Sequence, residues 1–102
     1  MAETPTTVHE AREAERARGQ QAVDALDRRL GGQHTPLRPE WDCGTCEQDW
    51  PCPPAQVRLA EAYGRDRVGL AMYLGAVYAA AVNELPVTLT GETWVRFVGW
   101  VR

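Results

Sequence analysis

Three closely spaced cysteines constrain the fold of this chain more than any other feature. Two residues separate Cys43 from Cys46, and five separate Cys46 from Cys52. A C-x2-C turn presents two sulfurs to one metal ion, and a third cysteine nearby adds a further ligand. Cys52 also precedes Pro53 and Pro54, which favour a helix start, and the positive end of a helix stabilises a thiolate. The sequence therefore predicts a metal site within this short segment.

A closed structural zinc site needs a fourth ligand. His34 is the nearest imidazole, with eight residues between it and Cys43. The carboxylates of Asp42, Glu47 and Asp49 are the alternative donors. We predict a zinc ion held by His34 and the three cysteines, with an iron–sulfur cluster on the same residues as the alternative.

The composition limits the cellular compartment and the class of partner that we expect for this protein. A chain of 102 residues accommodates one domain, and its three cysteines cannot all pair with one another. No apolar secretory segment follows the first methionine, so we expect a reducing, cytoplasmic location and metal-bound or free thiols. The net charge is −3, lysine is absent and the arginines are dispersed. This balance argues against nucleic acid as a partner.

The N-terminal region is predicted to be one long charged helix. Thr7 and Glu10 form a T-x-x-E capping box, and the Gly-Gly pair after Leu30 supplies a stop. The first half of this helix carries charges at helical spacing and almost no large apolar residue, so we expect it to be solvated and partly flexible. The second half carries leucines and should dock. We therefore divide the chain into a charged helix over residues 1–30 and a domain over residues 31–102, which holds the zinc loop and three helices.

Three further helices are predicted after an irregular loop. Residues 31–54 are rich in Gly, Pro, Cys and Trp, and a loop of this length needs something such as a metal to order it. Helices are expected over about 53–63, 67–85 and 90–101, from a Pro-Pro start, an aspartate N-cap and a threonine N-cap. Residues 86–90 contribute at most a short extended piece. The fold class is thus all-α: a small helical domain with an irregular metal-binding loop between a long N-terminal helix and a C-terminal helical bundle.

The expected helix over 67–85 is apolar or small throughout its middle. Its length approaches the thickness of a bilayer core, but its alanines and glycines and the polar residues close to its ends favour a buried central helix over a membrane span. Ala71, Gly75 and Ala79 recur at helical spacing and form a smooth groove. We expect this groove to receive another helix of the same chain, with a homodimer seam as the alternative.

The last expected helix carries an apolar stripe. Trp94, Phe97, Val98 and Val101 follow helical spacing without a gap, which predicts that they pack into the core. Trp100 lies off this stripe, so we predict that it is an exposed residue that contacts a partner.

Two more tryptophans, Trp41 and Trp50, flank the cysteines. Tryptophan is common among the residues that dominate binding between proteins. We therefore expect these two side chains either to form an exposed anchor pair for a protein partner or to cover the metal site.

A wider pattern extends over about residues 34–102. It joins W-x-C-x2-C-x3-W-P-C, which begins at Trp41, to a closing R-F-V-G-W, which begins at Arg96. This pattern resembles a group of short actinobacterial proteins, some of which carry an automatic flavin reductase label. The cysteine spacing is also similar to that of the last three ligands in the WhiB-like iron–sulfur regulators. The sequence lacks the earlier cysteine and the Gly-Trp turn of those regulators, and it has no Gly-rich phosphate loop or βαβ unit for a flavin.

These features favour a small zinc-stabilised protein-interaction or regulatory module without catalytic activity. The first alternative is a redox sensor that uses an iron–sulfur cluster or a zinc–thiolate switch. A zinc enzyme is less favoured, because it requires an open coordination position, with Glu47 as its base, and the sequence lacks the paired deaminase motifs. A flavin-linked reductase is less favoured because no flavin site is visible. The expected partner is a protein.

Overall fold

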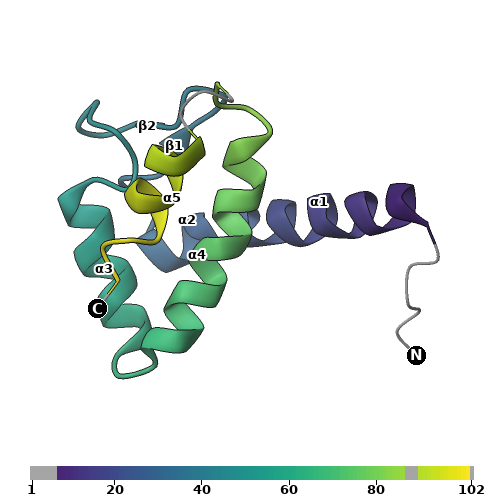
Figure 1. Ribbon diagram of the computed structural model, residues 1–102. Helices are drawn as coiled ribbons and strands as arrows, with labels where there is room; N and C mark the ends of the chain where they lie inside the picture. The colour runs from purple at the N-terminus through teal and green to yellow at the C-terminus, as the bar shows by residue number, and fades with distance from the viewer. Residues whose placement is uncertain (1–6, 87–89, 102) are drawn as a thin grey trace.

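Helices dominate the structure, a computed structural model that describes residues 7–86 and 90–101. Figure 1 shows α1 extending away from a cluster that the other elements form. In chain order the elements are α1 (Val8–Asp24), α2 (Leu26–Leu30), β1 (Pro36–Leu37), β2 (Asp42–Cys43), α3 (Pro53–Tyr63), α4 (Arg67–Val82) and α5 (Thr90–Phe97). This order confirms the predicted helical class with a Cys- and His-bearing loop between helices. Most of the extended piece predicted at 86–90 lies outside the described residues.

The N-cap predicted at Thr7, one half of the capping box, is confirmed at the start of α1. The side-chain oxygen of Thr7 accepts a hydrogen bond from the amide of Glu10 at 3.1 Å. The helix does not run unbroken to Leu30 as predicted. It is interrupted at Ala25, where φ is −75° and ψ is −15°, and α2 then continues to Leu30. The C-cap, Gly31, has a φ of 65° and provides the expected stop. Nothing in the local sequence explains the interruption.

A close helix contact joins α1 to α4 at Gly19. A Cβ atom placed on Gly19 would lie 3.2 Å from the Cβ of Ala80 and 3.3 Å from the carbonyl oxygen of Ala76. The hydroxyl of Tyr73 on α4 adds to this contact by donating to the carbonyl oxygen of Ala22 at 2.5 Å. Small residues therefore let the two helices approach, as expected for close helix packing.

The predicted groove at Ala71, Gly75 and Ala79 does not receive another helix of this chain at its centre. A Cβ atom on Gly75 would meet no atom of the described residues within 4 Å. Helix α1 lies instead on the neighbouring face of α4, against Ala76 and Ala80. The expectation of an intramolecular contact through Gly75 is therefore wrong. Helix α1 packs against Ala76 and Ala80, which each follow a residue of the predicted groove in sequence.

The predicted boundaries of α3 and α4 are mostly confirmed. Helix α3 begins at Pro53 and ends at Tyr63, and its C-cap, Gly64, has a φ of 55°. Helix α4 follows Asp66, whose carboxylate accepts a hydrogen bond from the amide of Gly69 at 2.9 Å. It ends at Val82, a few residues earlier than predicted. Within the described ranges, no helix combines the length and the apolarity that crossing a membrane requires.

Helix α5 is shorter than predicted, and the residues that it buries differ from those predicted. It ends at Phe97, so the predicted stripe stops one turn early. Phe97 and Val98 are buried as predicted, but Trp94 is 47% exposed and packs edge-on against Tyr78 of α4, with ring centroids 5.1 Å apart. Thr93, one turn before Phe97, takes the buried place because these two residues share the face that α5 turns to the core.

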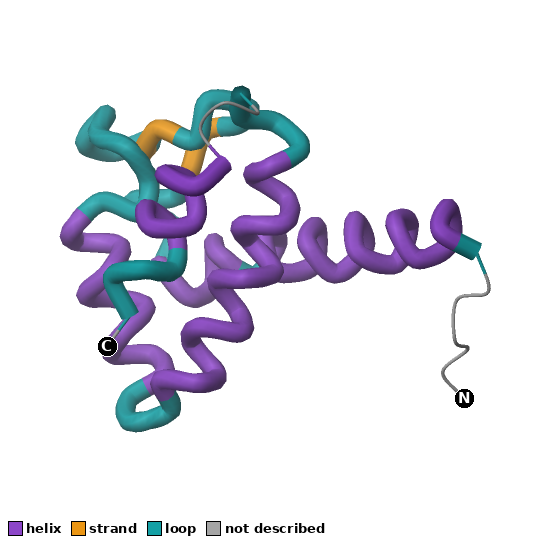
Figure 2. Tube along the Cα trace, in the orientation of Figure 1, coloured by secondary structure: helices purple, strands orange, loops and turns teal. Residues whose placement is uncertain are grey.

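The loop between α2 and α3 is more regular than predicted. Its two short strands, orange in Figure 2, pair antiparallel, with Pro36 opposite Cys43 and Leu37 opposite Asp42. This pairing brings the start of the loop beside the C-x2-C turn. As a result, His34 lies next to the cysteines although it precedes the strands.

Candidate metal centre

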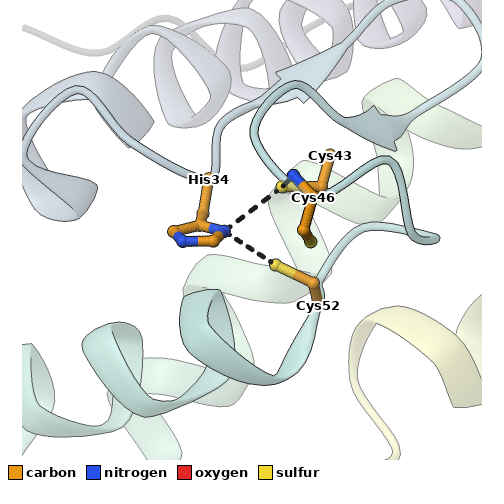
Figure 3. A group of neighbouring side chains, drawn as sticks. All are labelled: His34, Cys43, Cys46 and Cys52. Carbon is orange, nitrogen blue, oxygen red and sulfur yellow. Dashed lines mark hydrogen bonds between the residues drawn. The ribbon is translucent and has the colours of Figure 1, made fainter.

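Four side chains converge in this loop: His34, Cys43, Cys46 and Cys52. Their ligand atoms all lie within 4.8 Å of one another. Nδ1 of His34 is 3.4 Å from Sγ of Cys43 and 3.4 Å from Sγ of Cys52, and Figure 3 shows the imidazole facing both sulfurs. All three cysteines are free thiols. The structure thus brings together every residue of the predicted ligand set, in a group able to hold a metal ion.

The separations suit one tetrahedral ion. Zinc–sulfur bonds of ~2.3 Å and zinc–nitrogen bonds of ~2.0 Å imply donor–donor edges of about 3.5–3.8 Å. The two sulfur–nitrogen separations of 3.4 Å are close to such an edge. The alternative donors Asp42, Glu47 and Asp49 are exposed and lie outside the group. The imidazole is therefore the fourth donor that the fold supplies.

The C-x2-C turn directs backbone N–H groups at the sulfur of Cys43. The amides of Thr45 and Cys46 lie 3.4 and 3.5 Å from it. Two features close the turn: the amide of Cys43 donates to the carbonyl of Gln48 at 2.7 Å, and Glu47 adopts a φ of 62°. Hydrogen bonds to a thiolate stabilise its charged form, so the turn prepares this sulfur for a cation.

Hydrogen bonds also hold His34 opposite the turn. Its amide donates to Oγ1 of Thr45 at 2.9 Å, and its carbonyl accepts the indole N–H of Trp50 at 2.8 Å. The carbonyl of the next residue, Thr35, accepts the amide of Gly44 at 2.9 Å. His34 has a φ of 56°, which is uncommon for a residue with a side chain. The hydrogen bonds on both sides of it stabilise this conformation.

The two buried sulfurs differ in their affinity for a proton. Burial alone would raise the pKa of Cys43, but hydrogen bonds from the amides of Cys46 and Thr45 outweigh burial and lower this pKa to about 6. Burial raises the pKa of Cys52 to about 12, and the amide of Ala55 at the start of α3 does not offset it. The start of α3 favours the thiolate of Cys52, as expected, but burial has the larger effect on this pKa. A bound cation must supply the attraction that ionises it.

Trp41 and Trp50 lie in the core beneath the loop. Both side chains are 0% exposed, so the expectation of an exposed anchor pair is wrong. Their ring centroids are 6.1 Å apart, and they lie 5.4 and 5.6 Å from the ring of Phe97. Large aromatic rings bury more apolar area than the other side chains of this loop, so they attach the loop to α5. The second expectation, that the two rings cover the metal site, stays a prediction.

Charged side chains fix the positions of both tryptophan segments. Nε of Arg96 on α5 donates to the carbonyl of Trp50 at 2.7 Å, and its Nη2 donates to the carbonyl of Trp41 at 2.5 Å. On the other side, the carboxylate of Glu84 accepts the indole N–H of Trp41 at 2.6 Å and the guanidinium N–H of Arg38 at 2.8 Å. The sequence analysis missed Glu84 and Arg38, which are 46 residues apart and carry no local signal.

Trp100, predicted to be an exposed contact residue, is half-buried. Its indole N–H donates to the carbonyl of Phe97 at 2.9 Å. The ring also lines a shallow pocket of about 200 Å³ together with Leu70 and Arg67. Part of Trp100 remains accessible, so its role in partner contact stays a prediction.

Comparisons of the chain with protein-family models, with curated proteins and with solved structures give no match. The functional argument therefore rests on the geometry of the donors and on the residues that hold them.

Proposed function

We propose that the protein is a small cytoplasmic, zinc-stabilised interaction or regulatory module without catalytic activity. The observation that carries this proposal is the donor set, three sulfurs and one imidazole nitrogen within 4.8 Å of one another. Thiolates combined with an imidazole are the usual ligands of structural zinc sites. The buried rings of Trp41, Trp50 and Phe97 support the loop that carries these ligands.

Four protein donors complete a tetrahedral coordination sphere. A catalytic zinc keeps one position open for water, and His34 would occupy that position here. Three thiolates and a neutral imidazole would leave the ion with a net charge of about −1, which disfavours ionisation of a bound water. The donor set therefore favours a role in folding over a role in hydrolysis.

The compactness of the donors favours one ion over an iron–sulfur cluster. In a cluster, several irons share the protein ligands, which spreads the ligands more widely than a single ion does. A donor group within 4.8 Å surrounds one ion without rearrangement of the loop. A brown protein after anaerobic purification would favour the cluster instead.

A zinc–thiolate redox sensor is the second candidate, and the uneven burial of the ligands favours it. Cys43 and Cys52 are almost fully buried, whereas Cys46 is half-buried. An oxidant would therefore reach Cys46 first. Loss of this thiolate would weaken the site, and the loop would lose its order with the ion.

Metal analysis of anaerobically purified protein tests the proposal. We expect one zinc per chain, and a cobalt-substituted protein whose absorption bands report a tetrahedral, sulfur-rich site. Chelation should lower the melting temperature while most of the helical circular dichroism remains, since α1 and α4 contact each other outside the loop. The control Glu47→Gln changes an exposed carboxylate beside Cys46 and should keep the zinc. Metal-free protein whose melting does not respond to a chelator would overturn the proposal.

We also propose that short proteins with the W-x-C-x2-C-x3-W-P-C and R-F-x-G-W motif share this centre. Besides the cysteines, the motif contains Trp41, Trp50, Arg96 and Phe97 in this chain, which are the residues that hold the loop. On this proposal, the motif specifies the support of a metal loop rather than a flavin site.

A further inference from the structure

The C-x2-C turn lies at the tip of a small hairpin over residues 41–50. At its base, the amide of Trp50 donates to the carbonyl of Trp41 at 2.9 Å, and nearer the tip the amide of Cys43 donates to the carbonyl of Gln48 at 2.7 Å. These hydrogen bonds join backbone groups and involve no ligand side chain. The hairpin therefore does not need a metal ion for its own contacts.

This hairpin carries two of the four candidate ligands. Cys43 and Cys46 are the first and fourth residues of its turn, whereas His34 precedes the hairpin and Cys52 follows it, as Figure 3 shows. The sulfurs of Cys43 and Cys46 lie within 4.8 Å of each other. The Cα atoms at the ends of such a turn are less than ~7 Å apart, which is the range that a disulfide bridges. When the ion leaves, the hairpin keeps these two sulfurs together.

Cys46 is the most accessible of the three cysteine ligands. Cys43 and Cys52 are 0% and 1% exposed, and Cys46 is half-buried. The susceptibility of a thiolate to oxidation follows its accessibility, and oxidation is reversible where a second cysteine lies beside the first. Cys46 has such a neighbour in Cys43.

Exposed carboxylates share the hairpin with the accessible sulfur. Asp42, Glu47 and Asp49 are all exposed, and Glu47 directly follows Cys46. The guanidinium of Arg96 contacts the hairpin at its other end, through the two carbonyls at the base. Charges of one sign near a site repel ions of the same sign and do not repel neutral molecules. The hairpin therefore favours a small, uncharged oxidant over an anionic one.

We propose that a neutral hydroperoxide oxidises Cys46, and that Cys43 then forms a disulfide with Cys46 and releases the ion. The inference rests on the proposed zinc site and names its regulation: the oxidant class, the cysteine that reacts first and the cysteine that completes the disulfide.

The two steps balance in atoms and electrons. The thiolate of Cys46 attacks one oxygen of the hydroperoxide ROOH, an S–O bond forms, the O–O bond breaks, and the leaving alkoxide takes a proton from water to give ROH. The thiolate of Cys43 then attacks the sulfenic sulfur of Cys46, the S–S bond forms, the S–O bond breaks, and the leaving hydroxide becomes water on protonation. The two sulfurs together lose two electrons, which the peroxide gains. An ion that loses two of its three thiolates dissociates.

Contacts outside the ligand set make the change reversible. Arg96 on α5 donates to the carbonyls of Trp41 and Trp50 at 2.5 and 2.7 Å, and the rings of both tryptophans pack with Phe97 in the core. Loss of the ion therefore frees the imidazole of His34 and leaves the base of the hairpin attached to α5. A thiol reductant with added zinc should restore the centre and its melting temperature.

Hydrogen peroxide added to the zinc-loaded full chain tests the proposal. A zinc indicator should record one zinc released for each peroxide consumed, and a thiol reductant should allow the protein to take the zinc up again. Zinc that stays bound while peroxide is consumed would overturn the proposal, as would zinc released without a disulfide.

Peptide mapping identifies the cysteines that pair. Free thiols are alkylated under denaturing conditions, and cleavage after Glu47 separates Cys43 and Cys46 from Cys52. The peptide that ends at Glu47 should be unalkylated and lighter by two hydrogens than its reduced form, and the peptide with Cys52 should be alkylated. A disulfide that links the two peptides would overturn the assignment.

Two variants that each lack one buried ligand test the order of the steps. Cys52→Ser should form the same disulfide, because its hairpin is unchanged. Cys43→Ser lacks the second thiol of the hairpin, so dimedone, a reagent for sulfenic acids, should label Cys46. Circular dichroism establishes that both variants fold. A Cys43→Ser protein without dimedone on Cys46 would overturn the roles of both cysteines.

Glu47→Gln tests the class of oxidant. Removal of this charge beside Cys46 should accelerate zinc release by the anion peroxymonosulfate, while release by hydrogen peroxide changes less than about two-fold. Equal effects on the two oxidants would overturn the preference for a neutral hydroperoxide.

The zinc content of the protein before oxidation distinguishes the two proposals. A zinc-loaded protein that hydrogen peroxide does not alter overturns the oxidation and leaves the metal centre intact. A protein purified without metal overturns the zinc-stabilised function, and its peptide map still decides whether Cys43 and Cys46 are the pair.

Discussion

Arg96 and Trp41 are joined by a hydrogen bond that spans 55 residues of sequence, from Nη2 of the guanidinium to the carbonyl oxygen, at 2.5 Å. The same guanidinium donates from Nε to the carbonyl of Trp50 at 2.7 Å. Both carbonyls belong to the loop that carries the candidate metal ligands. The last helix therefore holds two segments of this loop together, and the candidate metal centre depends on residues far from the cysteines in sequence.

Arg96→Lys should weaken the metal loop. A lysine ammonium cannot reproduce the planar pair of donors, so one of the two carbonyls loses its partner. We expect a loss of ~1–3 kcal/mol in the free energy of unfolding, and faster release of zinc to a chelator. Denaturant unfolding and chelator-competition kinetics measure the two effects. The control Arg12→Lys, on the exposed part of α1, should change neither. Wild-type values for Arg96→Lys would mean that its two hydrogen bonds contribute little.

Trp50→Phe removes one N–H donor and keeps an aromatic ring in the core. The lost donor holds the carbonyl of His34 at 2.8 Å, so the backbone of the imidazole ligand is released. We expect a loss of ~1–3 kcal/mol in stability and weaker zinc binding in competition titrations. Trp94→Phe, at a half-exposed position, is the matched control and should cost less. The opposite order of the two variants would contradict this account of the loop.

Short-range signals in the sequence predicted the parts of the structure that neighbouring residues determine. The cap at Thr7, the stop at Gly31 and the helix start at Pro53 each depend on backbone preferences within one turn, and each is confirmed. The C-x2-C turn is equally local. His34 was predicted only as the nearest imidazole, and the pairing of β1 with β2 is what brings it to the sulfurs.

Contacts between distant segments determine the parts that the sequence did not reveal. A tryptophan beside a metal loop looks the same in sequence whether it faces solvent or core, and the burial of Trp41 and Trp50 follows from Arg96 and Phe97. Gly19 and Gly75 pose the same problem. Only the packing of α1 on α4 decides that Gly19 is crowded while Gly75 is open.

Gly19→Leu should overpack the contact between α1 and α4. Even a Cβ atom at this position would lie 3.2 Å from the Cβ of Ala80, so a larger side chain must push the helices apart. We expect a loss of ~1–3 kcal/mol in the free energy of unfolding. Ala17→Leu, exposed on the same helix, should stay within about 0.5 kcal/mol of the wild type.

Gly75→Leu provides a second comparison for the packing of α4. The sequence alone predicts overpacking at this position, whereas the structure predicts that the stability of the monomer stays near that of the wild type. Thermal denaturation of dilute protein measures both glycine variants. A stable Gly19→Leu protein beside an unstable Gly75→Leu protein would show that α1 packs on the other face of α4.

Tyr73 should ionise at unusually high pH. Burial raises its pKa to about 12, although Arg29 lies nearby and lowers it. An unfolded tyrosine has a pKa of about 10, so the folded protein favours the neutral phenol. The resulting stabilisation is complete below pH ~10 and is lost as the pH rises towards 12. Tyr73→Phe should reduce this alkaline loss of stability and remove one late step from an ultraviolet titration of phenolate. An unchanged alkaline profile would exclude this role.

His34→Ala should do less damage than any substitution of a cysteine ligand. The imidazole brings no charge to the ion, and water can take its position, or a carboxylate from Asp42 or Glu47 can move to it. Cys46→Ser removes one of the three thiolates, and a neutral hydroxyl binds zinc poorly at neutral pH. We therefore expect His34→Ala to keep one zinc per chain at reduced affinity, with a changed cobalt spectrum. Cys46→Ser should lose most of its metal, and its melting temperature should fall close to that of the metal-free protein. We would rank the variants by their zinc content after gel filtration, their cobalt absorption spectra and their melting temperatures. Metal-free His34→Ala protein beside zinc-loaded Cys46→Ser protein would reverse the ranking and make the imidazole the essential ligand.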